Sequence, residues 1–206
     1  HGKFRRQRQM CIRDRGSVKN AFSVIKDKWS NIDFVLHSIA FSNKDELKGK
    51  YLDTSRNNFV DTMLISCFSF TEVANEASKI MNSGGSMLTL TYDGSQKYIR
   101  NYNVMGVAKA ALESSVRYLA ADLGELNIRV NALSAGPMKT LAMAGISGGK
   151  NMMKWSEKNS MLQRNINLED VGKSGLYLLS DLSSGVTGEI HYVDSGYSKV
   201  GVPKEI

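Results

Sequence analysis

The stretch between residues 86 and 134 constrains the fold most, because two short apolar runs enclose one long amphipathic segment. Ser86–Tyr92 follows the turn-forming sequence NSGG and is typical of a buried strand. Apolar side chains then recur at three- and four-residue steps over Asn103–Leu123, which predicts a helix, and Ile128–Ser134 is a second apolar run. Strand, helix and strand of this kind predict a parallel sheet covered by helices.

The same stretch carries chemistry at helical spacing. Lys109 lies seven residues after Tyr102, so both lie on one face of a helix that begins near Asn103. A phenol beside an ammonium can donate a proton to an oxygen that becomes negative and can stabilise its charge. The alternative is that Tyr102 only packs and Lys109 is a solvated helix lysine, and the pair alone does not decide between them.

Further elements follow from the same patterns. The sequence predicts more helices and strands and one irregular region without clear periodicity. The helices are Ser17–Trp29, a long one over Ser55–Met81 that is broken at most once, and Glu169–Leu182; the strands are Ile32–His37 and Ile190–Val193; the irregular region is Met138–Arg164.

Five motifs occur in one order along the chain. They are HSIAFS (37–42), LTLTYDG (88–94), NYNVMGVAKAALE (101–113), IRVNALSAGPMKTLA (128–142) and GEIHYVDSGYS (188–198). Together, over roughly residues 16–206, they resemble the NAD(P)H-dependent enoyl-acyl-carrier-protein reductases, a branch of the short-chain dehydrogenase/reductase superfamily. Other members of that superfamily place the lysine four residues after the tyrosine, where this chain has Gly106. The resemblance implies an α/β fold with a Rossmann-like doubly wound parallel sheet.

The resemblance also implies a reaction and its catalytic residues. The enzymes of this family reduce the carbon–carbon double bond of trans-2-enoyl-acyl-carrier-protein thioesters in type II fatty acid synthesis, with hydride from NADH; NADPH is not excluded. Tyr102 would donate to the enolate oxygen and Lys109 would bind the nicotinamide ribose. Tyr92 would be the second tyrosine, at the mouth of the acyl pocket, although a strand-end tyrosine can also simply pack.

Binding residues are implied in the same way. The residues implied to line the cofactor are Ser38, Ile39, Ala40, Lys109, Pro137, Met138, Thr140 and Ala142. The residues implied to line the substrate are Ser42, Tyr92, Met105, Met143, Ile146 and Met152. Residues 138–152 are expected to form a mobile lid over the substrate. A methionine-rich stretch can also be ordinary core, but the glycines in this one favour a mobile loop. We expect His37 to be structural rather than a general base.

Charge and cysteine content argue against several other functions, namely binding of nucleic acid, lipid or metal. Most of the net charge of +7 lies in residues 1–15, which we expect to be an unrelated basic tail, disordered or artefactual, ahead of a single domain over 16–206. A basic tail can touch nucleic acid or anionic lipid, but the nearly neutral remainder argues against either partner. Cys11 and Cys67 form no metal-binding motif, so we expect no metal and a cytoplasmic location. No apolar run is long enough for a membrane span. The expected partners are acyl carrier protein and further copies of the chain in a homotetramer.

No glycine-rich turn between a first strand and a helix precedes Gly16, although the family binds the cofactor pyrophosphate there. We therefore expect an N-terminally truncated chain that lacks the first strands of the sheet and has little activity by itself. A carbonyl-reducing short-chain dehydrogenase and an inactive remnant without cofactor binding remain alternatives. The choice of NADH or NADPH, the acyl length and the sensitivity to inhibitors stay open.

Overall fold

A computed structural model describes residues 16–140, 143 and 147–203. Four parallel strands form one sheet in the order β1-β2-β3-β4. Their bounds are Ile32–His37 for β1, Met81–Thr91 for β2, Arg129–Ala135 for β3 and Ile190–Val193 for β4. The predicted parallel α/β fold is thereby confirmed.

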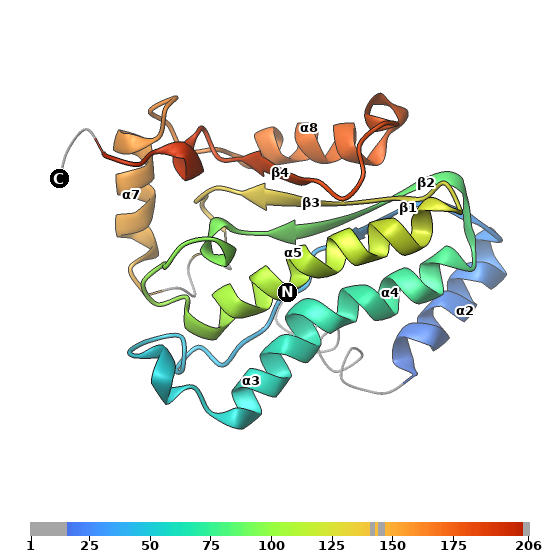
Figure 1. The fold of residues 1–206 in the computed structure, drawn as a ribbon, viewed down its shortest axis with the longest axis horizontal. Helices are drawn as coiled ribbons and strands as arrows, with labels where there is room; N and C mark the ends of the chain where they lie inside the picture. Colours follow the sequence, from blue (N-terminus) through green and yellow to red (C-terminus); the bar gives the residue numbers. More distant parts are fainter. Residues whose placement is uncertain (1–15, 141–142, 144–146, 204–206) are drawn as a thin grey trace.

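Helices cover both faces of this sheet (Figure 1). The helix α2 (Ser17–Trp29) and the pair α4 (Ser69–Ser78) and α5 (Asn103–Gly124) lie on one face, and α8 (Leu168–Leu179) lies on the other. A further helix, α7 (Gly149–Asn159), stands beyond the carboxyl ends of the strands. This is the edge at which ligands bind in open α/β sheets.

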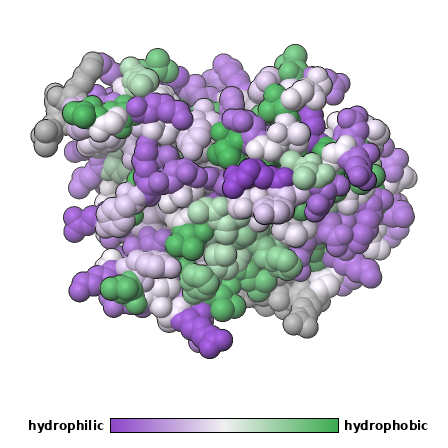
Figure 2. Space-filling model, in the orientation of Figure 1, coloured by the Kyte–Doolittle hydropathy of each residue, from purple (hydrophilic) through white to green (hydrophobic). Residues whose placement is uncertain are grey.

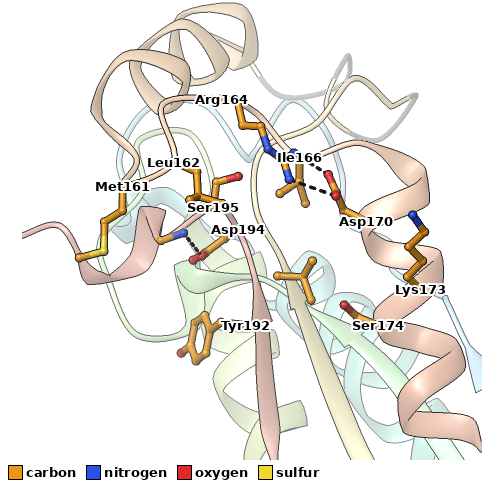
Figure 3. A pocket seen from close by; sticks show the side chains of 12 residues that line it. Met161, Leu162, Arg164, Ile166, Asp170, Lys173, Ser174, Tyr192, Asp194 and Ser195 are labelled. Atoms are coloured by element: carbon orange, nitrogen blue, oxygen red, sulfur yellow. Dashed lines mark hydrogen bonds and ion pairs between the residues drawn. The ribbon is translucent and has the colours of Figure 1, made fainter.

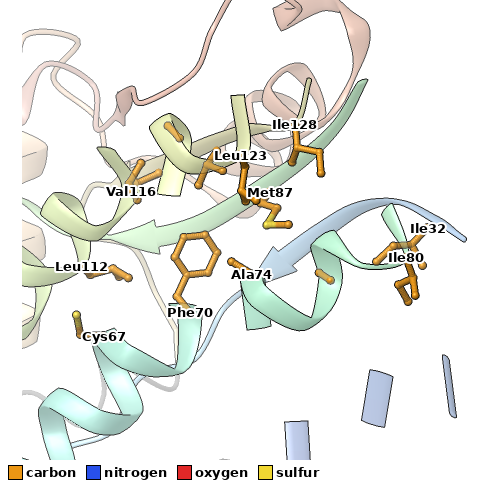
Figure 4. Close-up of a cluster of buried hydrophobic side chains, with 14 residues drawn as sticks. Ile32, Cys67, Phe70, Ala74, Ile80, Met87, Leu112, Val116, Leu123 and Ile128 are labelled. Atoms are coloured by element: carbon orange, nitrogen blue, oxygen red, sulfur yellow. The ribbon is translucent and has the colours of Figure 1, made fainter. Parts of the chain in front are cut away.

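The larger core lies between the sheet and the α4–α5 layer (Figure 4). Phe70 of α4, Met87 of β2 and Leu112 and Val116 of α5 are fully buried there. Complete burial of side chains of this size stabilises the fold by about 2 kcal/mol each. The opposite face has a smaller cluster of Leu88, Leu133 and Leu178. The larger core therefore holds α5, the helix that carries Lys109, in place against the sheet.

The prediction of a long helix over Ser55–Met81 is confirmed for most of this range but is wrong at the carboxyl end. The helix consists of α3 (Arg56–Met63), a π-helical turn at Leu64–Phe68 and α4, and it stops at Ser78. Met81, which the prediction put in the helix, begins β2. The predicted turn at 82–85 survives as an irregularity inside β2, where the pairing with β1 slips between Ile32↔Met81 and Phe34↔Ser86.

Two further expectations need correction. Residues 138–164 were predicted to be irregular, but they contain α7, whose buried residues are Gly149, Ser156 and Asn159. Its apolar side chains are only Met152, Met153 and Trp155, which is too short a pattern to identify the helix from the sequence. The predicted helix over Glu169–Leu182 ends earlier, at Leu179. Across the described residues, no helix is both long and apolar enough to cross a bilayer.

Candidate active site

Tyr92 and Tyr102 come together between the end of β2 and the start of α5. Tyr102 is the residue before the first helical turn, so α5 begins at Asn103, as the spacing predicted. The two rings meet edge to face, with centroids 5.2 Å apart and an interplanar angle of 76°. Both side chains are buried, and burial raises the pKa of both phenols. Both hydroxyls are therefore protonated donors at neutral pH.

Lys109 lies two helical turns after Tyr102 and is also buried. Its Nζ donates a hydrogen bond of 2.7 Å to the carbonyl oxygen of Leu90 in β2. Burial lowers the pKa of Lys109 to about 8, and the nearby Glu113 carboxylate opposes that shift. An ammonium has three donors, so this lysine can offer two more to a ligand such as a vicinal diol.

Two glycines let the loop after β2 approach α5 closely. A side-chain carbon at Gly106 would lie 2.6 Å from the carbonyl oxygen of Gly94, and one at Gly94 would lie 2.5 Å from the Tyr102 ring. Gly106 occupies the position, four after Tyr102, where other short-chain dehydrogenases carry their lysine. In this chain a side chain at that position would collide with backbone, which explains physically why the lysine follows one turn later.

Tyr92 is also covered from the far side of the site. Its hydroxyl donates to the sulfur of Met152 in α7 at 3.0 Å. Tyr197, which follows β4, is electrostatically coupled to Tyr92 and meets the ring of Trp155 of α7 edge to face at 5.3 Å. Sequence reasoning missed Tyr197, because only the fold brings residues so far apart in the chain together.

Most of the residues implied for the cofactor follow β1 and β3, the two parallel strands on either side of β2. Ser38, Ile39 and Ala40 follow β1, and Pro137 and Met138 follow β3, so the sheet register brings the two segments to the same edge. The two segments therefore lie on either side of β2, whose Leu90 carbonyl accepts the hydrogen bond from Lys109.

Beyond these segments, the Thr140 hydroxyl accepts a hydrogen bond of 3.1 Å from the Met143 backbone nitrogen. Ala142 lies outside the described residues. Backbone at this strand edge, together with the spare donors of Lys109, fits the ribose and nicotinamide part of a dinucleotide.

The residues implied for the substrate divide into two groups. Met105 and Met152 pack in one apolar cluster with Tyr92 and Tyr102, and Met143 lies close to Gly149 at the start of α7. Met105 and Met152 therefore lie against the tyrosine pair.

Ser42 is different, because its hydroxyl is engaged with α3. It donates to Asn58 Oδ1 at 3.2 Å and accepts from Thr62 at 3.0 Å. Met138 lines a cavity of about 430 Å³ on the side of α8. Ile146 lies outside the described residues.

His37 is a structural residue, as the sequence predicted. Its Nδ1 is 2.9 Å from Thr89 Oγ1, and its Nε2 is 2.9 Å from Ser69 Oγ. Burial, followed by the positive charge of Lys109, lowers the pKa of His37 to about 3. The imidazole is thus neutral and has a partner at both nitrogens.

An open hollow lies elsewhere, between the end of β4 and α8 (Figure 3). It has a volume of about 520 Å³ and is lined by Tyr192, Ser195 and Arg164, among others. Arg164 is held by a bidentate ion pair with Asp170, at 2.7 and 3.1 Å. None of the predicted catalytic residues lines this hollow. Buried donors and an ammonium converge instead at the tyrosine pair, which makes it the candidate site. Within the described residues, no group of three His, Cys, Asp or Glu side chains could hold a metal ion.

Comparison with known sequences agrees with this geometry. The profile of the family described as Enoyl-(Acyl carrier protein) reductase matches residues 6–198. "Enoyl-[acyl-carrier-protein] reductase [NADH] 2" of Rhizobium meliloti is 62% identical over 192 residues, which are 93% of this chain and 72% of the relative. The "[NADPH] FabI" of Staphylococcus aureus is 50% identical, over 93% of this chain and 75% of that protein. Because the family match begins inside residues 1–15, the proposed boundary of the tail stays a prediction.

Solved structures give the same result. FabI from Candidatus Liberibacter asiaticus superimposes with a TM-score of 0.91 at 57% identity, covering 94% of this chain and 75% of that one. The Anaplasma phagocytophilum reductase in complex with NAD has a TM-score of 0.90 at 54% identity, covering 94% of this chain and 74% of that one.

Proposed function

The chain belongs to the enoyl-(acyl carrier protein) reductase family, and we propose from this premise that it reduces trans-2-enoyl thioesters of acyl carrier protein with NADH. The observation that carries the proposal is the buried triangle of Tyr92, Tyr102 and Lys109 at the carboxyl edge of the sheet. Related proteins named for NADH and for NADPH both exist, and we propose NADH because the more similar of these two relatives is named for it.

The cofactor, when bound, supplies the hydride for the β-carbon of the enoyl group. The protein then has to stabilise the negative charge that develops on the thioester oxygen. The protonated Tyr102 hydroxyl donates to that oxygen, and the positive charge of Lys109 lowers the energy of the resulting enolate. Lys109 also binds the ribose hydroxyls with its two spare donors.

The cofactor and acyl residues keep the roles that the resemblance implies. Ser38, Ile39, Ala40, Pro137, Met138 and Thr140, with Ala142, approach the nicotinamide half. Tyr92, Met105, Met143 and Met152, with Ile146, line the acyl chain, and their flexible thioethers suit acyl chains of different length. Ser42 shapes the loop beside the thioester through its bonds to α3.

The test compares two substrates. Reduction of crotonyl thioester is followed at 340 nm with NADH and then with NADPH, and acetoacetyl thioester is offered in parallel. The proposal expects turnover of the crotonyl substrate only, however slow, with preference for NADH. Reduction of acetoacetyl thioester instead would favour a carbonyl-reducing dehydrogenase.

We further propose that copies of the chain assemble into a tetramer and that it works in the cytoplasm with acyl carrier protein. Apolar side chains gather on the surface over α3, α4 and α5 (Figure 2), where Phe59, Val60, Phe68 and Val107 are 37–53% exposed. Exposed apolar patches of this kind mark protein contacts. Sedimentation velocity tests the assembly: the expected species is a tetramer, and Phe68→Lys should dissociate it.

A further inference from the structure

Glu113 of α5 is a buried carboxylate at the back of the tyrosine pair. It is only 2% exposed. Its Oε1 accepts hydrogen bonds from the hydroxyls of Thr91 at 2.7 Å and Ser95 at 2.5 Å, and its Oε2 accepts one from the Gln96 amide at 2.8 Å. Its position gives no hint of this in the sequence, since a glutamate inside a helix usually faces solvent.

All three donors belong to the short segment that carries Tyr92. Thr91 precedes this tyrosine directly, and Ser95 and Gln96 close the turn that follows it. One residue earlier, Leu90 is held by Lys109. Both sides of Tyr92 are therefore tied to the helix that begins after Tyr102.

The charge of Glu113 has a second consequence. All three donors are neutral, so the burial of an ionised carboxylate here is not balanced by a direct ion pair. Lys109 lies one helical turn away on α5, and the two charges favour each other. The other ionisable groups coupled to Lys109 are the Cys67 thiol of the π-helical turn and His37 of β1, which is neutral. Among these neighbours, Glu113 is the carboxylate, and it acts on Lys109 in the direction opposite to burial.

We propose that Glu113 is a positioning residue for the reduction, which fixes Tyr92 through residues 91–96 and helps Lys109 to keep its positive charge. This inference rests on the proposed function. It adds a residue that touches neither substrate nor cofactor and acts only through the two side chains in front of it.

The chain allows the two roles to be tested separately. Glu113→Gln removes the charge and keeps the shape, and the exposed Gln96 amide can turn to accept from the new amide. The double variant Thr91→Val with Ser95→Ala keeps the charge and removes two of the three bonds. Glu125→Gln is the matched control, because Glu125 is an exposed glutamate at the other end of α5.

The decisive readouts need no turnover. Lysine-selective NMR, assigned with Lys109→Met, follows the titration of Lys109, and hydrogen exchange follows the amides of residues 92–97. Glu113→Gln should move the Lys109 midpoint to lower pH by about half a unit or more, because an attractive charge has been removed. The double variant should leave that midpoint in place and speed exchange of the segment about tenfold or more. Glu125→Gln should do neither.

Kinetics add a third readout. The double variant should lower kcat for crotonyl thioester roughly ten- to hundredfold with little change in NADH affinity, because Tyr92 is misplaced. Glu113→Gln should weaken NADH binding more at pH 8.5 than at pH 6.5. If the Lys109 titration and the exchange of residues 92–97 match wild type in both variants, the inference is wrong. A wild-type chain that does not reduce the thioester would count against the proposed function alone, since the titration and exchange would still decide the role of Glu113.

Discussion

The two sides of the candidate site are held in different ways. On one side, β2 and α5 present Tyr92, Tyr102 and Lys109 as buried side chains, backed by Glu113 and its three hydrogen bonds; we call this the fixed wall. On the other side stands α7, which we call the cover. Its described contacts with the site are the sulfur of Met152 on Tyr92 and the ring of Trp155, 38% exposed, on Tyr197.

This difference separates two tasks. Donors that stabilise developing charge work best when they are fixed before the reaction, and the fixed wall provides that. Sulfur–aromatic and ring–ring contacts are each worth only about 1 kcal/mol, so these two contacts constrain the site less than the buried side chains of the fixed wall do. Changes in the wall should therefore alter turnover and stability, whereas changes in the cover should alter substrate affinity.

The largest effect is expected from Tyr102→Phe in the fixed wall. Loss of a hydrogen bond to the developing enolate should lower kcat about 100- to 1000-fold, while NADH affinity stays within twofold because Lys109 is intact. Steady-state kinetics and NADH fluorescence titration measure the two quantities. Tyr98→Phe, at a tyrosine that is 83% exposed, is the control. An equal loss of NADH affinity and of kcat would contradict separate roles for the tyrosine and the lysine.

As pH rises, NADH affinity and the contribution of Lys109 to the unfolding free energy should change in opposite directions. The charge of Lys109 is lost as pH rises through about 8 in the folded chain, against 10.5 for an ordinary lysine. NADH affinity should therefore fall above pH 8. The unfolded chain keeps that proton longer, so the Lys109 contribution to unfolding free energy should rise between pH 8 and 10.5, by about 3 kcal/mol at most.

Denaturant melts of wild type and Lys109→Met, taken at intervals over pH 7–10, isolate this contribution. The difference between the two is needed because Cys67, whose pKa is raised by burial, destabilises the fold over the same range. An unfolding free-energy difference that does not change with pH would show that Lys109 is not buried as described.

The fixed wall could largely be predicted from the sequence, and the cover could not. Apolar periodicity located the end of β2, all of α5 and β3, because these elements bury apolar side chains on a regular stripe. The seven-residue spacing then placed Tyr102 and Lys109 two turns apart at the start of α5. The helix α7 was missed because it is mostly polar, with apolar side chains only at Met152, Met153 and Trp155.

Glu113 was missed for another reason. Its partners lie 17–22 residues earlier in the chain, and only the fold shows that the segment 91–96 returns to the helix. One signal was available, since Glu113 follows Lys109 by four residues and a helix brings such a pair together. The spacing alone does not show whether the face of α5 that carries Lys109 and Glu113 is buried or exposed to solvent. Only the structure shows that both residues are buried.

A smaller effect than that of Tyr102→Phe is expected at Gly106, where the loop after β2 comes closest to α5. Gly106→Ala places a carbon 2.6 Å from the Gly94 carbonyl oxygen, and backbone cannot easily move away. We expect a loss of about 1–3 kcal/mol of unfolding free energy together with reduced kcat. Gly172→Ala in α8 is the matched control, because nothing lies within 4 Å of its added carbon, and it should stabilise the helix by about 0.5–1 kcal/mol. If both variants are stabilised, the close approach of loop and helix does not exist.

The smallest effect is expected in the cover. Met152→Ala removes the sulfur that accepts from the Tyr92 hydroxyl, and it should raise KM for crotonyl thioester about threefold and lower the unfolding free energy by under about 1 kcal/mol. Turnover at saturation should not change, because the donors of the fixed wall remain in place. Lys154→Ala is the neighbouring control, because Lys154 is an exposed residue of α7, and its KM should match wild type. A fall in kcat for Met152→Ala comparable to that of Tyr102→Phe would mean that α7 takes part in charge stabilisation, and the separation of wall and cover would then fail.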